Sequence, residues 1–192
     1  MKKSLTILLV ALSAIMIAGC AAPPTEEMNR AADAVTRAEN DANAVAYAGP
    51  TLSRAREALN QMQAEAASKR YDSAKSYSAE AIAAAEKAIS DGKIAADRAR
   101  NEAAALLKAL DTEIAQTEGE LAASKEVPGI ILDFAPLDAD LAAAKSAHTD
   151  ANASLSAARY AEAVTKAQPI RPLLADIRAG LSQAAMTAVR KK

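Results

Sequence analysis

Two side-chain types that metal sites and many catalytic sites need are almost absent from this 192-residue chain, which has one cysteine, Cys20, and one histidine, His148. A transition-metal centre takes three or four Cys, His or carboxylate ligands. A nucleophile is normally activated by a base such as histidine beside it. The sequence also contains no Gly-rich phosphate loop, nucleophile elbow or zincin motif. We therefore expect no enzyme activity, no metal ion and no cofactor.

His148 and three aspartates are the remaining candidates for binding a cation. His148 lies on the apolar stripe of an expected helix, where it is either a histidine in a helix seam or a pH-sensitive contact. Asp133, Asp138 and Asp140 lack the glycine turn and the twelfth-position Glu of a calcium loop. We expect His148 to pack in a seam, and Asp138 and Asp140 to favour a helix start through capping and the helix dipole.

Two tyrosines occupy similar places in the sequence, each directly after an arginine. Tyr71 and Tyr160 could line a ligand groove. Both lie at the start of an expected helix and on its apolar stripe, so we expect them to pack on the preceding helix with the hydroxyl at the surface.

The densest apolar cluster after residue 20 follows the turn sequence Val127-Pro128-Gly129. It consists of Ile130, Ile131, Leu132 and Phe134. In an alanine-rich protein, such bulky residues either close the end of a bundle or meet a partner. They are the candidate partner surface of this chain.

The first twenty residues carry charge, apolar and small residues in a defined order. Lys2 and Lys3 precede an apolar run over residues 5–17, which is short for a bilayer span and typical of a signal peptide. Gly19 and Cys20 follow at once, and this order resembles a bacterial lipobox. The resemblance implies cleavage between Gly19 and Cys20 and attachment of a diacylglyceryl group to the Cys20 thiol. The alternative is an ordinary cleaved signal peptide with a chance cysteine.

A lipidated Cys20 would anchor the protein to a membrane without embedding its body, since each buried acyl methylene contributes about 0.8 kcal/mol. Ala21 follows the cysteine. This is similar to the sorting pattern of outer-membrane lipoproteins, which implies a body in the periplasm; the inner membrane and the cell surface are the alternatives. Without Lys2 and Lys3 the chain has 21 basic and 24 acidic side chains. That balance gives no basic face for a nucleic-acid partner.

The C-terminal Arg190-Lys191-Lys192 offers a second attachment. It is similar to the end of Braun-type murein lipoproteins, whose last lysine is joined covalently to peptidoglycan. The resemblance implies a peptidoglycan link through Lys192. The alternative is that these cations stabilise a helix C-terminus.

Composition predicts the fold class. The chain has 53 alanines, one Phe, no Trp, six Gly and seven Pro. Alanine is the strongest helix former, and together with Leu, Glu, Lys and Arg it favours long helices or coiled coil over a sheet.

Apolar residues at spacings of three and four predict helical stripes over residues 28–45, 52–66, 71–122, 137–155 and 160–188. Gly49-Pro50 is expected to end the first helix, and Thr51 to cap the second. The third shifts phase near Gly92, where it bends, breaks or continues. Pro169 and Pro172 are expected to kink or split the last helix.

An internal repeat at an offset of 89 pairs Leu52 with Leu141 and Arg70-Tyr71 with Arg159-Tyr160. We predict an all-α fold, an elongated antiparallel helical bundle of two related helical hairpins with one long central helix. The expected organisation is a signal peptide (1–19), a lipidated tether (20–27), an N-terminal hairpin region with the long helix (28–122), an apolar loop (123–136), a C-terminal hairpin (137–189) and a basic tail (190–192).

Residues 47–52 read Tyr-Ala-Gly-Pro-Thr-Leu, and Ala55-Arg56, Leu59 and Arg70-Tyr71-Asp72 follow. This pattern resembles an uncharacterised family of alanine-rich bacterial envelope lipoproteins, a domain of unknown function, over about residues 30–100. Gly49 departs from the family's Tyr-Ala-Pro order. The resemblance implies an envelope location and a helical hairpin, and carries over no catalytic residue.

The expected function is therefore that of a non-catalytic, membrane-anchored periplasmic lipoprotein. It would serve as a helical scaffold, spacer or adaptor, with a second copy of itself or another envelope protein as partner. The alternatives are a binding subunit that recruits an envelope enzyme or assembly machine, and a lipoprotein linked to peptidoglycan through Lys192.

Overall fold

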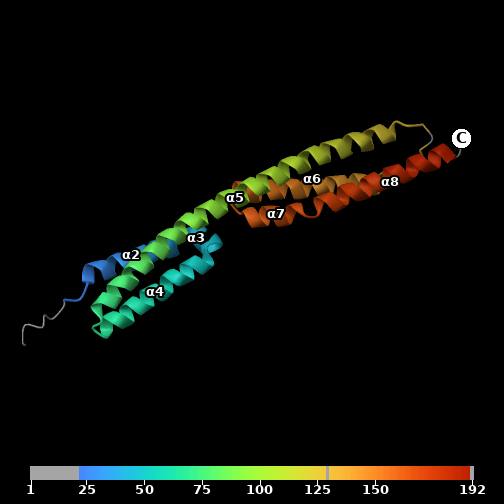
Figure 1. The fold of residues 1–192 in the computed structure, drawn as a ribbon. Helices are drawn as coiled ribbons and strands as arrows, with labels where there is room; N and C mark the ends of the chain where they lie inside the picture. Colours follow the sequence, from blue (N-terminus) through green and yellow to red (C-terminus); the bar gives the residue numbers. More distant parts are fainter. Residues whose placement is uncertain (1–21, 129, 191–192) are drawn as a thin grey trace, which may run out of the picture. The chain divides into compact units, whose positions relative to one another are not determined.

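The computed structural model describes residues 22–128 and 130–190, without the side chains of residues 189 and 190. Within these ranges the chain forms helices joined by short connections and has no β-strand (Figure 1). The predicted all-α class and the long central helix, α5 (Tyr71–Lys125), are confirmed. The chain divides into two compact units, unit 1 (residues 1–93) and unit 2 (residues 94–192), so the division falls inside α5.

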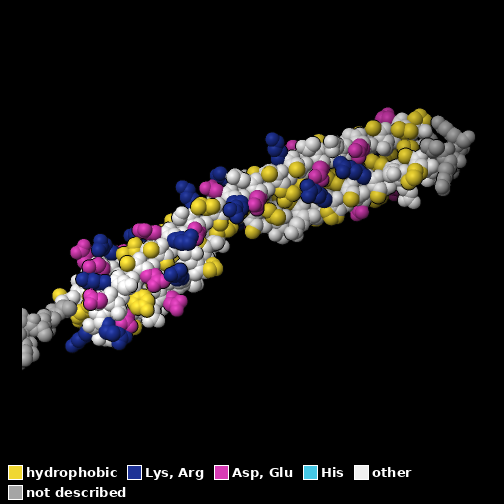
Figure 2. Space-filling view, in the orientation of Figure 1, with side chains coloured by type: hydrophobic (Ala, Val, Ile, Leu, Met, Phe, Trp, Pro, Cys, Tyr) yellow, Lys and Arg dark blue, Asp and Glu magenta, His cyan; other side chains and the backbone are white. Residues whose placement is uncertain are grey.

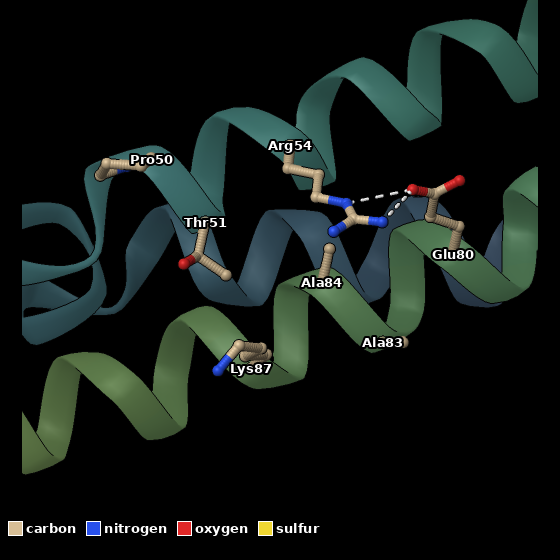
Figure 3. A pocket seen from close by; sticks show the side chains of 7 residues that line it. All are labelled: Pro50, Thr51, Arg54, Glu80, Ala83, Ala84 and Lys87. Atoms are coloured by element: carbon tan, nitrogen blue, oxygen red, sulfur yellow. Dashed lines mark hydrogen bonds and ion pairs between the residues drawn. The ribbon is translucent and has the colours of Figure 1, made fainter.

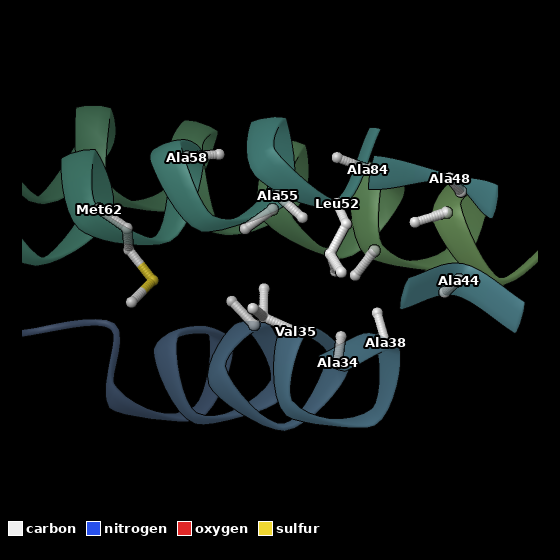
Figure 4. Close-up of a cluster of buried hydrophobic side chains, with 14 residues drawn as sticks. Ala34, Val35, Ala38, Ala44, Ala48, Leu52, Ala55, Ala58, Met62 and Ala84 are labelled. Carbon is white, nitrogen blue, oxygen red and sulfur yellow. The ribbon is translucent and has the colours of Figure 1, made fainter. Parts of the chain in front are cut away.

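Unit 1 packs α2 (Thr25–Asn40), α3 (Ala42–Tyr47) and α4 (Gly49–Ala67) with the first part of α5. Its core is mostly alanine (Figure 4). The larger buried side chains among the described residues of this core are Val35, Leu52 and Met62. Small side chains let helix axes lie at the short end of the usual range of about 8–10 Å. They also bury less apolar area than Leu or Ile would, so each contact contributes less to stability.

The first predicted stripe is interrupted at Asp41, which separates α2 from α3. Asp41 has extended backbone angles, and its carboxylate accepts a hydrogen bond from the backbone N–H of Ala44 at 2.8 Å. This is N-capping, which starts a new helix in a new direction. Ala42 and Val45 therefore leave the buried face that the spacing predicted for them, and Val45 is 54% exposed.

Gly49 and Pro50 begin α4, where the sequence predicted that they end a helix. Proline is favoured in the first turn of a helix because its missing N–H would have no helical partner there. Ala48 is the residue between α3 and α4, with an N–H bonded to the carbonyl of Ala44 at 2.9 Å. Thr51 lies inside α4 and is not its N-cap, so that prediction was wrong.

Helix α5 continues through Gly92, which is buried. A Cβ atom built on Gly92 would lie 2.6 Å from the backbone nitrogen of Ala44 and 2.6 Å from the carbonyl carbon of Asn43. Such distances are not tolerated between a real Cβ and backbone atoms. The glycine that suggested a break is therefore explained by the close approach of α3 to α5.

The turn from α4 to α5 has the hydrogen bonds of a Schellman motif. The N–H of Arg70 bonds to the carbonyl of Glu65 at 2.9 Å, and the N–H of Lys69 to that of Ala66 at 2.9 Å. Lys69 has a φ of 59°, in the left-handed region where glycine is usual. The predicted break at residues 68–70 is present.

The turn from α6 (Ala135–Ser156) to α7 (Tyr160–Ala167) repeats this geometry 89 residues later. The N–H of Arg159 bonds to the carbonyl of Ser154 at 2.9 Å, and that of Ala158 to Leu155 at 3.0 Å. Ala158 has a φ of 58°. The sequence offset thus corresponds to a matched backbone conformation at the two turns.

Unit 2 packs α6, α7 and α8 (Ile170–Arg190) with the second part of α5. Two ion pairs join α5 to α8: Glu113 with Arg171 at 3.1 Å, and Glu120 with Arg178 at 3.3 Å. From the first pair to the second, both helices advance by seven residues, so they run parallel. The core of unit 2 has more large side chains than that of unit 1, including Leu107, Leu110, Ile114, Leu121, Leu137, Leu141, Ile170, Leu174, Ile177 and Leu181.

The predicted split of the last helix is present. Helix α7 ends at Ala167 and α8 begins at Ile170, with Pro169 between them. Pro169 has no N–H to donate and its ring obstructs the preceding turn, so the helix stops before it. Pro172 lies in the first turn of α8, where proline needs no partner.

Two glycines of the same helix test the close approach of α3 to α5. Gly92→Ala should lower the free energy of unfolding by about 1–3 kcal/mol, because overpacking against the backbone of α3 outweighs the better helix propensity of alanine. Gly119 has no atom within 4 Å of a built Cβ. Gly119→Ala should therefore raise stability by up to about 1 kcal/mol. Urea unfolding followed by circular dichroism measures the free energy of unfolding of both variants. If the two substitutions changed it by equal amounts in the same direction, the packing assigned to Gly92 would be contradicted.

The left-handed turn residue of unit 2 gives a second prediction. Ala158→Gly should raise the free energy of unfolding by about 0.5–1 kcal/mol, since glycine adopts this conformation without steric strain. The neighbouring Ala157 has a φ of −84° and is the matched control. Ala157→Gly should be neutral or destabilising, because it adds only backbone freedom in the unfolded chain. Thermal unfolding that ranks the two variants in the opposite order would contradict the assignment.

Candidate functional site

The α5–α6 loop (residues 126–134) carries the candidate partner surface and closes one end of unit 2. Leu132 and Phe134 are partly buried and pack against the core of this unit. Ile130 is half-buried. Ile131 is 83% exposed, the largest value among the exposed large apolar residues that the structure describes. The cluster therefore divides into residues that close the bundle end and one isoleucine that faces solvent.

Lys125, the last residue of α5, joins this loop to α6. Its Nζ lies 2.7 and 2.8 Å from the two carboxylate oxygens of Asp138 and 5.8 Å from the centre of the Phe134 ring. Asp133 accepts a hydrogen bond from the backbone N–H of Ala135 at 3.0 Å, and so helps to start α6. The sequence predicted capping and helix-dipole roles for Asp138 and Asp140. Asp138 lies in the first turn of α6, where its charge favours the helix dipole, but the aspartate of this region that accepts a backbone N–H is Asp133. Over residues 22–128 and 130–190, no three His, Cys, Asp or Glu side chains are grouped to hold a metal ion.

His148 lies in the seam between α6 and α5 of unit 2. Its Nε2 donates a hydrogen bond to the carbonyl oxygen of Leu107 at 3.0 Å. The ring is half-buried and borders a shallow depression that also contains Asp111, Glu118 and Lys145. Lys145 and Glu118 form an ion pair across this depression. The seam position that the sequence predicted for His148 is the one observed.

A serine, a glutamate and a lysine meet near the α6–α7 turn, a group that no motif in the sequence predicts. The Oγ of Ser154 lies 3.2 Å from Glu162 Oε1 and accepts a hydrogen bond from Lys166 Nζ at 3.0 Å. Serine beside lysine can in principle form a nucleophile and its base. Ser154 is fully buried, however, so its hydroxyl is closed to a substrate and serves packing.

Glu162 has a pKa below its ordinary value, chiefly because Lys166 donates a hydrogen bond to its carboxylate; the positive charge of Arg159 acts in the same direction. The equivalent turn of unit 1 has the same arrangement with a different carboxylate. There Arg70 donates to Glu65, through Nη2 at 2.7 Å, and lowers the pKa of that carboxyl. The arginine keeps its place at both turns, while its acidic partner lies before the turn in unit 1 and after it in unit 2. The 89-residue offset is the sequence signal that leads to these pairs.

Tyr71 and Tyr160 are the first residues of α5 and α7. Both are half-buried, directly after the two matched turns. Neither tyrosine lines any of four surface hollows found among the described residues. Their position fits packing at the turn.

A shallow groove of about 370 Å³ runs between α4 and the first part of α5 (Figure 3). Arg54 crosses it to Glu80, with its Nη2 at 2.8 Å from Oε1, and Lys87 lies 3.0 Å from Asp91. Each cation thus has a carboxylate beside it, and the remaining lining is Pro50, Thr51, Ala83 and Ala84. The groove has the character of a solvated helix seam and offers no concentrated charge to a ligand.

Charges of both signs are interspersed over the face seen in Figure 2, in keeping with the near balance of basic and acidic residues. Within residues 22–128 and 130–190, no helix is long and apolar enough to cross a bilayer.

Gly19, Cys20 and Lys192, the predicted cleavage, lipidation and peptidoglycan-link residues, lie outside the part of the chain that the structure describes. No family model matches the chain, and no curated protein or solved structure is similar enough to count as a match. The resemblance to alanine-rich envelope lipoproteins stays a prediction.

The division of the α5–α6 loop gives a test with two matched substitutions. Phe134→Ala should lower the free energy of unfolding by about 1–2 kcal/mol, less than the roughly 3–5 kcal/mol of a fully buried phenylalanine, because the ring is only partly buried. Ile131→Ser should change stability by less than about 0.5 kcal/mol, because the side chain faces solvent. Thermal unfolding of the purified variants decides, and a larger loss for Ile131→Ser would contradict the packing described.

Proposed function

We propose that this protein is a lipid-anchored lipoprotein of the outer membrane whose helical body lies in the periplasm and acts as a scaffold, spacer or adaptor of the cell envelope. Its role is binding and positioning, with no catalysis. The order of Lys2, Lys3, the apolar run and Gly19-Cys20 supports the anchor. The resemblance of residues 30–100 to alanine-rich envelope lipoproteins supports the location.

One structural observation supports this proposal above the others: the folded body begins almost directly after Cys20. The N–H of Thr25 bonds to the carbonyl of Pro23 at 2.8 Å, and the N–H of Met28 to that of Pro24 at 3.0 Å. Pro24 is already buried. A lipid on Cys20 would therefore hold a helical unit directly at a bilayer surface, which suits a scaffold better than a domain that searches a large volume.

The continuity of α5 also supports a scaffold role. Residues 92–95 are helical, so the two units are joined through a helix and not through a loop. Each unit also has a core of its own.

The adaptor form of the proposal has its own observation. Ile131 is 83% exposed beside the partly buried Leu132 and Phe134, and an envelope protein that covers this end of unit 2 would bury it. A second copy of the chain would serve equally as the partner.

The test of the anchor is metabolic labelling with radioactive palmitate in a bacterium that expresses the full chain. The wild-type protein should carry the label and sediment with membranes. Cys20→Ser should lose the label and keep its signal peptide. Ala21→Ser, which leaves the cysteine in place, is the matched control and should be labelled. An unlabelled wild-type protein, or a label that persists in Cys20→Ser, would overturn the proposal.

A further inference from the structure

The start of α2 and the α4–α5 turn lie at the same end of unit 1. Helices α2 and α4 are antiparallel neighbours, joined by an ion pair at 2.6 Å between Glu39 and Arg56. Counting back along α2 and forward along α4 from this pair brings Thr25 level with Arg70. Figure 1 shows the beginning of α2 and the turn beside each other.

The chain between this end and Cys20 is short. Pro23 already accepts a hydrogen bond from Thr25, so no more than three residues, 20–22, separate the proposed lipid attachment from this hydrogen-bonded start of the body. Three residues span at most about 10 Å, even when fully extended. The polar headgroup layer of one leaflet is itself about 5–7 Å thick. A unit held this closely has its anchored end at the headgroups.

We propose that the α4–α5 turn, residues 68–70, and the first turn of α2 form a membrane-contacting end of unit 1, and that its partner is the phospholipid headgroup layer of the bilayer that holds Cys20. This inference rests on the proposed lipidation. It goes further because it assigns a contact to residues that are far from Cys20 in sequence.

The side chains at this end suit a headgroup layer that carries both charges. Ser68 and Lys69 are exposed, as are Glu26 and Asp72. Lys69 can donate to phosphate oxygens, and the acidic residues can accept from amine headgroups. Because the signs are mixed, the contact is set by the short connection to the lipid and not by attraction to an anionic surface.

The test uses the lipidated full chain in vesicles of phosphatidylethanolamine with a minority of phosphatidylglycerol, in which some headgroups carry a nitroxide quencher. Lipidation consumes the thiol of Cys20, so an introduced cysteine is the only reactive one. A fluorescent label is placed through Lys69→Cys, through Ser68→Cys as a second variant, and through Ala46→Cys as the control. Ala46 is exposed on α3, beyond the far end of the 16-residue α2, whose rise is about 24 Å.

The expected result is quenching several-fold stronger at positions 68 and 69 than at position 46. A further variant inserts a Gly–Ser linker of about 16 residues between Ala21 and Ala22, with a mean span of about 20–24 Å. This insertion should remove the difference while the protein still floats with the vesicles. Far-ultraviolet circular dichroism checks that each variant keeps its helical content.

The outcomes separate the two proposals. A protein that floats with vesicles but is quenched no more at positions 68 and 69 than at position 46 overturns the membrane-contacting end and leaves the lipid anchor standing. Strong quenching that survives the inserted linker also overturns it, since the contact would not depend on the short connection. A protein that carries no acyl group and does not float overturns the anchor, and with it this inference.

Discussion

Helix packing in unit 1 depends mainly on side chains no larger than a methyl group. Its core is built mainly from alanines of α2, α3, α4 and α5, with Val35, Leu52 and Met62 between them. At Gly92 the limit is stricter, because the backbone of α3 occupies the space that even a methyl group would need. Since alanine buries little area, such a unit gains stability from many close contacts and few large ones. The core of unit 2 differs, because most of its buried positions hold Leu or Ile.

The two matched turns show what the chain holds constant and what it changes. Both have a Schellman hydrogen-bond pattern, a non-glycine residue in the left-handed region, and an arginine followed by a tyrosine. The carboxylate that pairs with the arginine is Glu65 in one turn and Glu162 in the other. The positions equivalent to these glutamates hold Ser154 and Ser73. An arginine–glutamate ion pair is thus present at both turns. The glutamate lies on the helix before the turn in unit 1 and on the helix after the turn in unit 2.

These features give the proposed function a consistent physical basis. A lipid at Cys20, three residues before Pro23, would fix one end of unit 1 at a bilayer, and α5 carries the chain on from that unit without a loop. Paired charges line helix seams in both units, while the exposed Ile131 offers the apolar contact that a partner would need.

The sequence by itself determined the helical class, the long central helix, the break at residues 68–70 and the split at Pro169. These follow from local rules: the propensity of alanine, the spacing of apolar residues and the missing N–H of proline. It also located the α5–α6 loop and, through the 89-residue offset, the two related turns. Only the tertiary structure decided that Gly92 is a contact with α3, that Asp41 turns the chain and exposes Val45, and that Phe134 packs while Ile131 does not. Those outcomes depend on which backbone segment lies beside a residue. The local spacing of residue types contains no information about neighbours that are distant along the chain.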